Sequence, residues 1–184
     1  MRKTALALSI LLLSGSAQAA NVGGANLSDK TTVGGQTLVL NGGAVRKKLF
    51  IKVYAAGLYL PTRQVAAERI LATDTPRQMV MHFLYDVDKG KIAEAWQEGL
   101  QANTPNTSPA VKQAFSTLAS WMEDMNKGER LVMTYVPGAG TTVEVKGKVK
   151  GVLPDKAVND AILATWIGPK PGPGEDFKKA LLGQ

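Results

Sequence analysis

The chain contains no cysteine and only one histidine, His82, among its 184 residues. Without cysteine it can form no disulfide, no thiolate metal site and no cysteine nucleophile. With one histidine, a two-histidine metal site cannot be built either. His82 stands in an apolar stretch, where a histidine with one structural hydrogen bond is more common than a general base. We therefore expect no metal ion and no cofactor.

The sequence also lacks nucleotide-binding fingerprints, dense basic runs and long hydrophobic runs. Its glycine pairs do not form the dinucleotide or P-loop patterns. The net charge is +7, but lysine and arginine are not clustered as in nucleic-acid-binding proteins. No segment reaches the roughly 20 apolar residues that span a bilayer. The mildly basic surface instead favours a small anionic ligand, or weak association with an anionic membrane surface.

The N-terminus has the three parts of an export signal. Arg2 and Lys3 give a positive start, and Ala5 to Leu13 form a short apolar run. Ala17-Gln18-Ala19 then provides a small-x-small cleavage pattern. A buried N-terminal helix is the alternative interpretation.

We accordingly expect residues 1–19 to be a signal peptide and residues 20–184 to be the mature domain. Export would place the protein outside the cytoplasm, in the periplasm. Loss of Arg2 and Lys3 would lower the net charge from +7 to +5.

Alternating apolar residues predict strands in the first half of the chain. Residues 21–35 are rich in Gly, Asn, Ser and Thr, and should form an irregular lead-in that could hold one edge strand. The β pattern begins at Thr37, breaks at Gly42-Gly43 and resumes from Leu49 to Leu60. Another strand should cover Gln78 to Tyr85, and its two apolar faces predict a central position in the sheet.

Helical spacing and turn signals organise the second half. Asp88 is a suitable N-cap for a helix through Leu100, and Ser108-Pro109 marks the start of a second helix. Hairpin strands should occupy residues 131–152, followed by helices at residues 155–166 and 175–182. This order predicts an α+β fold in which helices pack on one face of an antiparallel sheet.

Two pairs of segments carry a recognisable pattern. Asn41 to Arg46 is a glycine-rich stretch ending in arginine, and Phe50 to Leu60 has the form Phe-x-Lys-x-x-Ala-x-Gly-x-Tyr-Leu. Leu163 to Gly168 and Phe177 to Gly183 form the second pair. These segments resemble the chalcone isomerase family, in which a glycine-rich turn presents an arginine to the ligand cleft. The resemblance implies the chalcone isomerase-like open-faced β-sandwich. Together with its export signal, the chain is similar to the secreted bacterial branch of the family.

The resemblance also implies candidate site residues. The family contains plant enzymes that cyclise chalcones to flavanones, and non-catalytic relatives that bind fatty acids. Arg46 matches the arginine that stabilises the attacking phenolate oxygen in the enzymes. Tyr54 stands where the enzymes have threonine and the fatty-acid-binding relatives have tyrosine. Thr165 matches a hydroxyl residue near the substrate, whereas Ile92 to Gly99 lacks the tyrosine and asparagine of the enzymes.

The leading hypothesis is an exported, non-catalytic binder of a fatty acid or a similar small amphipathic carboxylate. Arg46 would anchor the anion through two parallel hydrogen bonds, with Tyr54 and Thr165 as further contacts. The acyl chain would lie between the sheet and the helices. Candidate walls are the large apolar residues Phe83, Trp96, Phe115, Met122 and Trp166.

Two alternatives remain open at this point. One is an isomerase (intramolecular lyase) of the chalcone isomerase type, acting on an enone-like substrate with Arg46 and Thr165. The other is a structural module whose cleft has closed, with Arg46 solvated or paired to an internal acid. Tyr54 would then make a structural hydrogen bond and Thr165 would bond its own backbone. A chain reversal at Lys47-Lys48 would moreover leave Arg46 and Tyr54 roughly 17 Å apart.

Overall fold

The computed structural model describes residues 19–184 of the protein. The predicted signal peptide lies, except for Ala19, outside the described residues. The strands are β1 (Ala19–Val22), β2 (Ala25–Ser28), β3 (Lys30–Val33), β4 (Gln36–Lys48), β5 (Ile51–Leu60), β6 (Arg77–Phe83), β7 (Arg130–Val136), β8 (Gly140–Val145) and β9 (Lys148–Leu153). The helices are α1 (Ala67–Ala72), α2 (Lys89–Asn103), α3 (Pro109–Ser120), α4 (Lys156–Ile167) and α5 (Glu175–Leu181).

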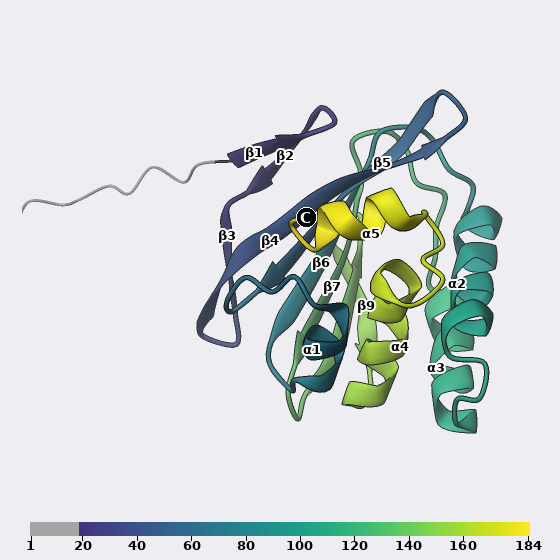
Figure 1. Ribbon diagram of the computed structural model, residues 1–184. Helices are drawn as coiled ribbons and strands as arrows, with labels where there is room; N and C mark the ends of the chain where they lie inside the picture. Colours follow the sequence, from purple (N-terminus) through teal and green to yellow (C-terminus); the bar gives the residue numbers. More distant parts are fainter. Residues whose placement is uncertain (1–18) are drawn as a thin grey trace, which may run out of the picture.

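Strands β3 to β9 form one antiparallel sheet in sequence order, and β6 is its central strand. Figure 1 shows the helices gathered on one side of this sheet. Both features confirm the predicted α+β architecture. Helices α2, α3, α4 and α5 were all predicted, whereas α1 is only six residues long and gives no clear periodicity.

The helix starts follow from capping chemistry. The Asp88 carboxylate accepts a hydrogen bond from the Gly90 N–H at 2.7 Å, which satisfies an amide that the first turn of α2 leaves free. Ser108 does the same for the Val111 N–H at 3.3 Å, with Pro109 at the first position of α3. Both predicted caps are confirmed, and they fix where α2 begins beside the sheet.

The two faces of the sheet bury different sets of residues. The larger core lies between the sheet and the helices, and includes Phe83, Phe115 and Ile162. A smaller core on the opposite face includes Leu38 and Tyr59, and the β1–β2 hairpin covers part of it. The lead-in was therefore wrongly predicted as mostly irregular, because the alternation in these four-residue strands is too short to detect.

The predicted break at Gly42-Gly43 is wrong, since β4 runs through both glycines. A side chain at Gly42 would collide with the backbone oxygens of Ala180 and Leu181 at the end of α5. One at Gly43 would collide with Val22 of β1. The glycines therefore allow close packing on both faces of a continuous strand.

The predicted chain reversal at Lys47-Lys48 is also wrong. The turn lies at Leu49 and Phe50, and Lys48 pairs with Ile51 across it. Between this pair and the Arg46–Tyr54 pair the register shifts, which leaves Val53 as an extra residue on β5. Such a β-bulge turns the following side chains toward the other face. This bulge shapes the candidate site.

Candidate functional site

An open cavity of about 600 Å³ lies between the far end of the β4–β5 hairpin, strand β6, and helices α2 and α4. This volume falls within the range of roughly 300–1,000 Å³ that is typical of small-molecule sites. Its lining is mostly apolar, with a few polar and charged groups: Arg46, Lys48, Leu49, Ile51, Val53, Tyr54, Met81, Phe83, Tyr85, Val87, Lys91, Ile92, Glu94, Ala95, Trp96, Glu98, Gly99, Thr165, Trp166, Gly172 and Pro173.

All three predicted site residues, Arg46, Tyr54 and Thr165, line this one cavity. Arg46 and Tyr54 are direct neighbours, because β4 and β5 pair them across the ladder. The separation of roughly 17 Å inferred from a turn at Lys47-Lys48 is therefore wrong, since directly opposed residues lie about 5 Å apart. Arg46 is also held on a strand rather than by a glycine-rich turn.

The bulge at Val53 explains why three closely spaced residues of β5 reach the same cavity. Adjacent residues of a regular strand point to opposite faces, yet Ile51, Val53 and Tyr54 all line it. The extra residue shifts the alternation, so Ile51 and Val53 join the face that Tyr54 occupies. These two apolar wall residues could not be identified from the alternating pattern alone.

The Tyr54 ring is buried and fixed from several sides. Its hydroxyl accepts a hydrogen bond from Trp166 Nε1 at 3.1 Å. Phe83 and Phe177 pack against the ring with centroid distances of 6.0 and 5.8 Å. The structural hydrogen bond weighed for Tyr54 is thus present, and the residue faces the cavity as well.

Burial raises the pKa of the Tyr54 phenol, while the Arg46 guanidinium and the Trp166 N–H oppose that rise. The phenol is therefore protonated at neutral pH. Within residues 19–184, no group accepts its proton. Tyr54 thus has a hydrogen-bond donor to offer beside Arg46.

Arg46 places a positive charge in the lining of this cavity, next to Tyr54. It is half-buried, and within the described part of the chain no carboxylate lies within 4.0 Å of it. The cavity has two acids of its own, Glu94 and Glu98 on α2, and Glu94 pairs with Lys91 at 3.3 Å. A buried or partly buried arginine normally has a carboxylate partner, so the Arg46 guanidinium is suited to an anionic ligand.

Thr165 lies on α4, where it packs closely against Gly99 of α2. Its hydroxyl donates to the Ile162 carbonyl at 2.7 Å, as is common for threonine within helices. The hydroxyl proton is therefore committed to the backbone, and Thr165 can offer a ligand only an acceptor. Glycine at position 99 allows the two helices to approach.

Three of the five predicted wall residues, Phe83, Trp96 and Trp166, do line the cavity. Trp96 and Trp166 stand perpendicular with ring centroids 5.2 Å apart. Phe115 and Met122 are instead core residues, so their prediction as walls is wrong. Phe115 packs against Trp96 with ring centroids 6.5 Å apart and is fully buried in the core.

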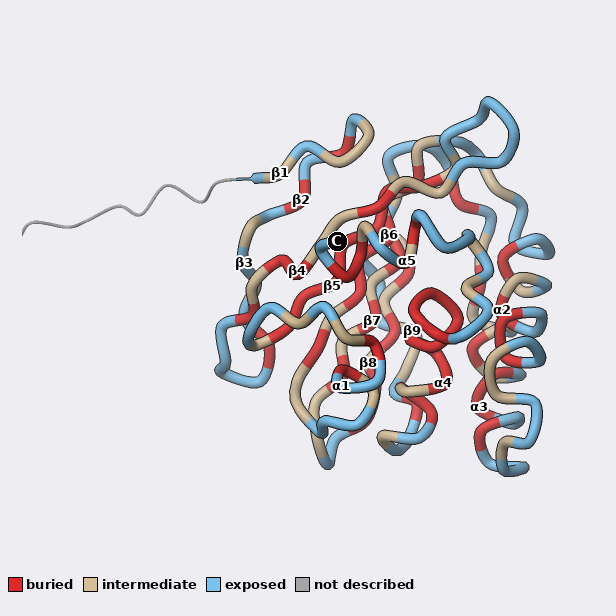
Figure 2. Tube along the Cα trace, in the orientation of Figure 1, coloured by how far each residue is buried: buried red, intermediate tan, exposed pale blue. Residues whose placement is uncertain are grey.

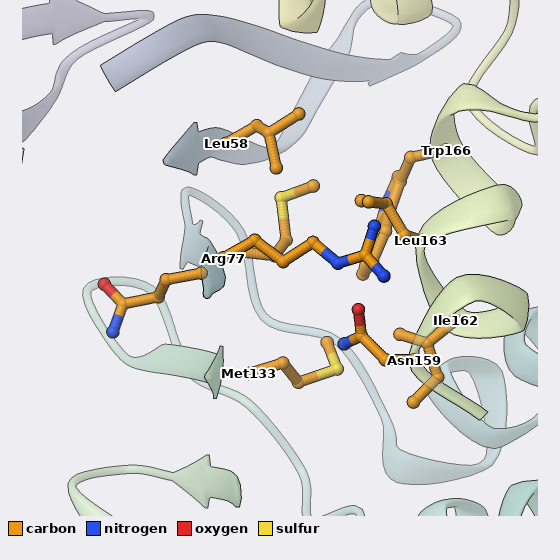
Figure 3. A pocket seen from close by; sticks show the side chains of 9 residues that line it. Leu58, Arg77, Met133, Asn159, Ile162, Leu163 and Trp166 are labelled. Atoms are coloured by element: carbon orange, nitrogen blue, oxygen red, sulfur yellow. The ribbon is translucent and has the colours of Figure 1, made fainter. Parts of the chain in front are cut away.

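A second void, of about 10 Å³, lies on the other side of Trp166. Figure 3 shows the Arg77 side chain reaching across it from β6 toward Asn159 on α4. Within residues 19–184, Nε of Arg77 and Oδ1 of Asn159 are buried without a hydrogen-bond partner. This void has the size and polar groups of a single-water site and is too small for an organic ligand. The larger cavity is therefore the candidate functional site.

His82 does not reach either cavity. It is half-buried on β6, between the core-facing residues Met81 and Phe83, and its Nδ1 accepts a hydrogen bond from Arg130 Nε at 3.3 Å. Burial and the Arg130 charge lower its pKa. The prediction of one structural hydrogen bond is confirmed, although the residue is not fully buried.

Two further features concern residues 19–184. No group of three or more histidine and carboxylate side chains there is arranged to hold a metal ion. No helix in this range is both long enough and apolar enough to cross a bilayer.

The fold described above agrees with a comparison to protein families. A family model described as chalcone isomerase-like matches residues 19–183. The chain belongs to the chalcone isomerase-like family. A search of curated protein sequences found no match to it.

Solved structures support the fold of this chalcone isomerase-like chain. It is similar to the crystal structure of a fatty-acid binding protein from Arabidopsis thaliana, with a TM-score of 0.64 and 18% sequence identity. The match covers 86% of this chain and 92% of the Arabidopsis chain. At this identity the likeness establishes the shared fold.

Proposed function

We propose that this protein is a non-catalytic binder of a fatty acid or a similar small amphipathic carboxylate. The observation that carries the proposal is the Arg46 guanidinium, which has no carboxylate partner in the described part of the chain and lines a mostly apolar cavity of about 600 Å³. Tyr54 lies directly opposite Arg46 and adds a neutral donor. Together they suit a carboxylate headgroup with an apolar tail.

Headgroup and tail contribute differently to binding. A charge-assisted hydrogen bond contributes about 1.5–3 kcal/mol. Each buried CH₂ group of an acyl chain contributes about 0.8 kcal/mol. The tail therefore supplies most of the affinity, whereas Arg46 selects an acid over a neutral lipid of the same length. The family and the fatty-acid binding function of the Arabidopsis relative support this proposal.

The alternative, an isomerase, has less support from the site. The Tyr54 phenol has a raised pKa and does not readily serve as a base. The Thr165 proton is donated to the Ile162 carbonyl, and the single histidine lies away from the cavity. We expect no cyclisation of a chalcone above its uncatalysed rate, and a clear acceleration that is lost in Arg46→Ala would favour the enzyme.

The test compares palmitate with hexadecanol, which has the same tail without the carboxylate. Each ligand displaces a neutral, apolar fluorescent probe from the wild-type protein and from Arg46→Ala. We expect Arg46→Ala to weaken palmitate binding roughly tenfold to hundredfold and to leave hexadecanol binding nearly unchanged. Arg63→Ala, at an exposed arginine outside the cavity, serves as the matched control. No palmitate binding, or equal loss for both ligands, would contradict the proposal.

We also propose that the protein is exported to the periplasm as a member of the secreted bacterial branch. The support is the sequence of residues 1–19, with its positive start, apolar run and Ala17-Gln18-Ala19 site. Expression of the full chain in a bacterial host, followed by N-terminal sequencing, tests this. We expect a mature N-terminus at Ala20 in the periplasmic fraction, whereas uncleaved protein in the cytoplasm would contradict export.

A further inference from the structure

The tip of the β4–β5 hairpin exposes large apolar side chains. Leu49 is 88% exposed and Phe50 is 101% exposed, and Ile51 beside them is 43% exposed. Figure 1 shows this hairpin projecting beyond the rest of the sheet, and Figure 2 shows its tip as exposed. Single exposed apolar residues are ordinary, but three consecutive ones on a projecting turn are not.

The turn also contains a residue that its backbone geometry disfavours. Leu49 has a φ of 55°, in the left-handed region where glycine or asparagine is normally found. Two-residue hairpin turns of this kind are usually built from glycine, asparagine or aspartate. The turn is instead formed by Leu49 and Phe50, although both side chains are almost fully exposed. Such local conflict between sequence and structure is typical of functional sites.

Lysines surround the apolar tip. Lys47, Lys48 and Lys52 are all exposed, and none forms an ion pair within residues 19–184. Lys52 reaches back to the Gly23 carbonyl at 3.4 Å, while the other two make no side-chain hydrogen bond there. No acidic residue lies between positions 30 and 67 of the sequence. The hairpin is thus a positively charged element with an apolar end.

The same tip forms one side of the ligand cavity. Lys48, Leu49 and Ile51 line the cavity, as does Tyr85, which is 52% exposed. These exposed lining residues mark the cavity's opening on the hairpin side. The exposed residues Glu94 and Glu98 of α2 also line the cavity. A surface that contacts the hairpin tip would therefore lie next to the opening.

We propose that the β4–β5 hairpin tip docks this protein on a lipid bilayer that contains anionic phospholipid. Leu49 and Phe50 enter the boundary between headgroups and acyl chains, and the flanking lysines bind the anionic headgroups. Docking in this way brings the cavity opening to the bilayer surface. The role of that contact in loading or releasing the ligand rests on the proposed function, whereas the docking itself does not.

A bilayer fits the tip better than a protein partner does. Even a phenylalanine buries at most about 250 Å². Two or three side chains therefore fall short of the roughly 800 Å² per partner that a stable protein interface needs. Insertion into a bilayer requires no matching surface, and apolar residues flanked by lysine suit it.

The test measures flotation of the protein with phosphatidylcholine vesicles that contain or lack phosphatidylglycerol. Phe50 and Lys47 do not line the cavity, so their variants leave the ligand site intact. We expect Phe50→Ser to reduce vesicle binding at least about tenfold, and Lys47→Gln to reduce it about fivefold on anionic vesicles. Val149→Ser, at an exposed valine on edge strand β9, is the matched control and should bind like the wild type.

The variant Phe50→Trp reports insertion directly. We expect its fluorescence to shift to the blue on addition of anionic vesicles, beyond any change in the wild-type protein. Absence of wild-type binding, or equal binding by Phe50→Ser, would overturn the docking proposal. So would a dimer in gel filtration that Phe50→Ser converts to a monomer, because the tip would then contact a second copy. Palmitate affinity, measured separately, shows whether the proposed function fails on its own.

Discussion

Tyr54 lines the candidate cavity, and its hydroxyl oxygen is also hydrogen-bonded to a buried core residue. The hydroxyl accepts the Trp166 N–H at 3.1 Å, and its residue also lines the cavity beside Arg46. The indole nitrogen is buried, so it depends on this acceptor. The Tyr54 side chain can thus hold Trp166 in place and also contact a ligand in the cavity.

The variant Tyr54→Phe should lower the free energy of unfolding by about 1–3 kcal/mol, because it leaves the buried Trp166 N–H without an acceptor. Urea unfolding of Tyr54→Phe, Trp166→Phe and the double variant measures this contribution. We expect the two single effects to be non-additive by about 1 kcal/mol. Strict additivity would show that the hydrogen bond does not stabilise the site.

His82 should make stability depend on pH. Burial and Arg130 lower its pKa in the folded protein below the usual 6.5, so the unfolded chain binds more protons just below that pH. The contribution of His82 to stability is therefore fully present above about pH 6.5 and is lost as the pH falls from there through the lower pKa of the folded protein. Urea unfolding at about pH 7.5 and about pH 5.5 should show a smaller loss for His82→Gln than for the wild type. An equal or larger loss would contradict this account.

The residues that carry the site differ in how far the sequence reveals them. Arg46, Tyr54 and Thr165 follow from family motifs, and all three line the cavity. Ile51 and Val53 are not predictable from alternation, since the bulge that exposes them to the cavity arises from pairing between strands. Phe115 and Met122 belong to the buried core, and the apolar periodicity of the sequence cannot distinguish a core residue from one that also faces a cavity.

The β4–β5 hairpin determines the geometry of the site. The two strands of the hairpin are 13 and 10 residues long. The bulge at Val53 brings Ile51, Val53 and Tyr54 of β5 to the cavity, which Lys48 and Leu49 at the tip also line. Sequence signals misplace the turn, because the residues at Leu49 and Phe50 are apolar and look like the start of a strand. Glycine or asparagine would have marked the turn.

The strain in this turn leads to a test of its own. Leu49→Gly should raise the free energy of unfolding by about 1 kcal/mol, because glycine tolerates the positive φ and little packing is lost. Phe50→Gly should not stabilise the protein, since Phe50 has no positive φ. Thermal unfolding of both variants provides the comparison. A destabilising effect of Leu49→Gly would show that leucine contributes packing at the tip.

The molecule as a whole follows from patterns that the sequence displays clearly. The antiparallel sheet, the central position of β6 and the two capped helices were all predictable from the sequence. The β1–β2 hairpin and α1 escape sequence analysis because they are short and gain their stability from packing on the sheet. The resulting layers leave an open cavity of about 600 Å³ beside the projecting hairpin.

The most direct measurement is a crystal structure of the protein with bound palmitate. We predict that the carboxylate lies within about 3 Å of the Arg46 guanidinium and accepts a hydrogen bond from the Tyr54 hydroxyl, with the acyl chain along the cavity between β6 and α2. A carboxylate that points to solvent, or palmitate bound elsewhere with Arg46 free in water, would contradict the account.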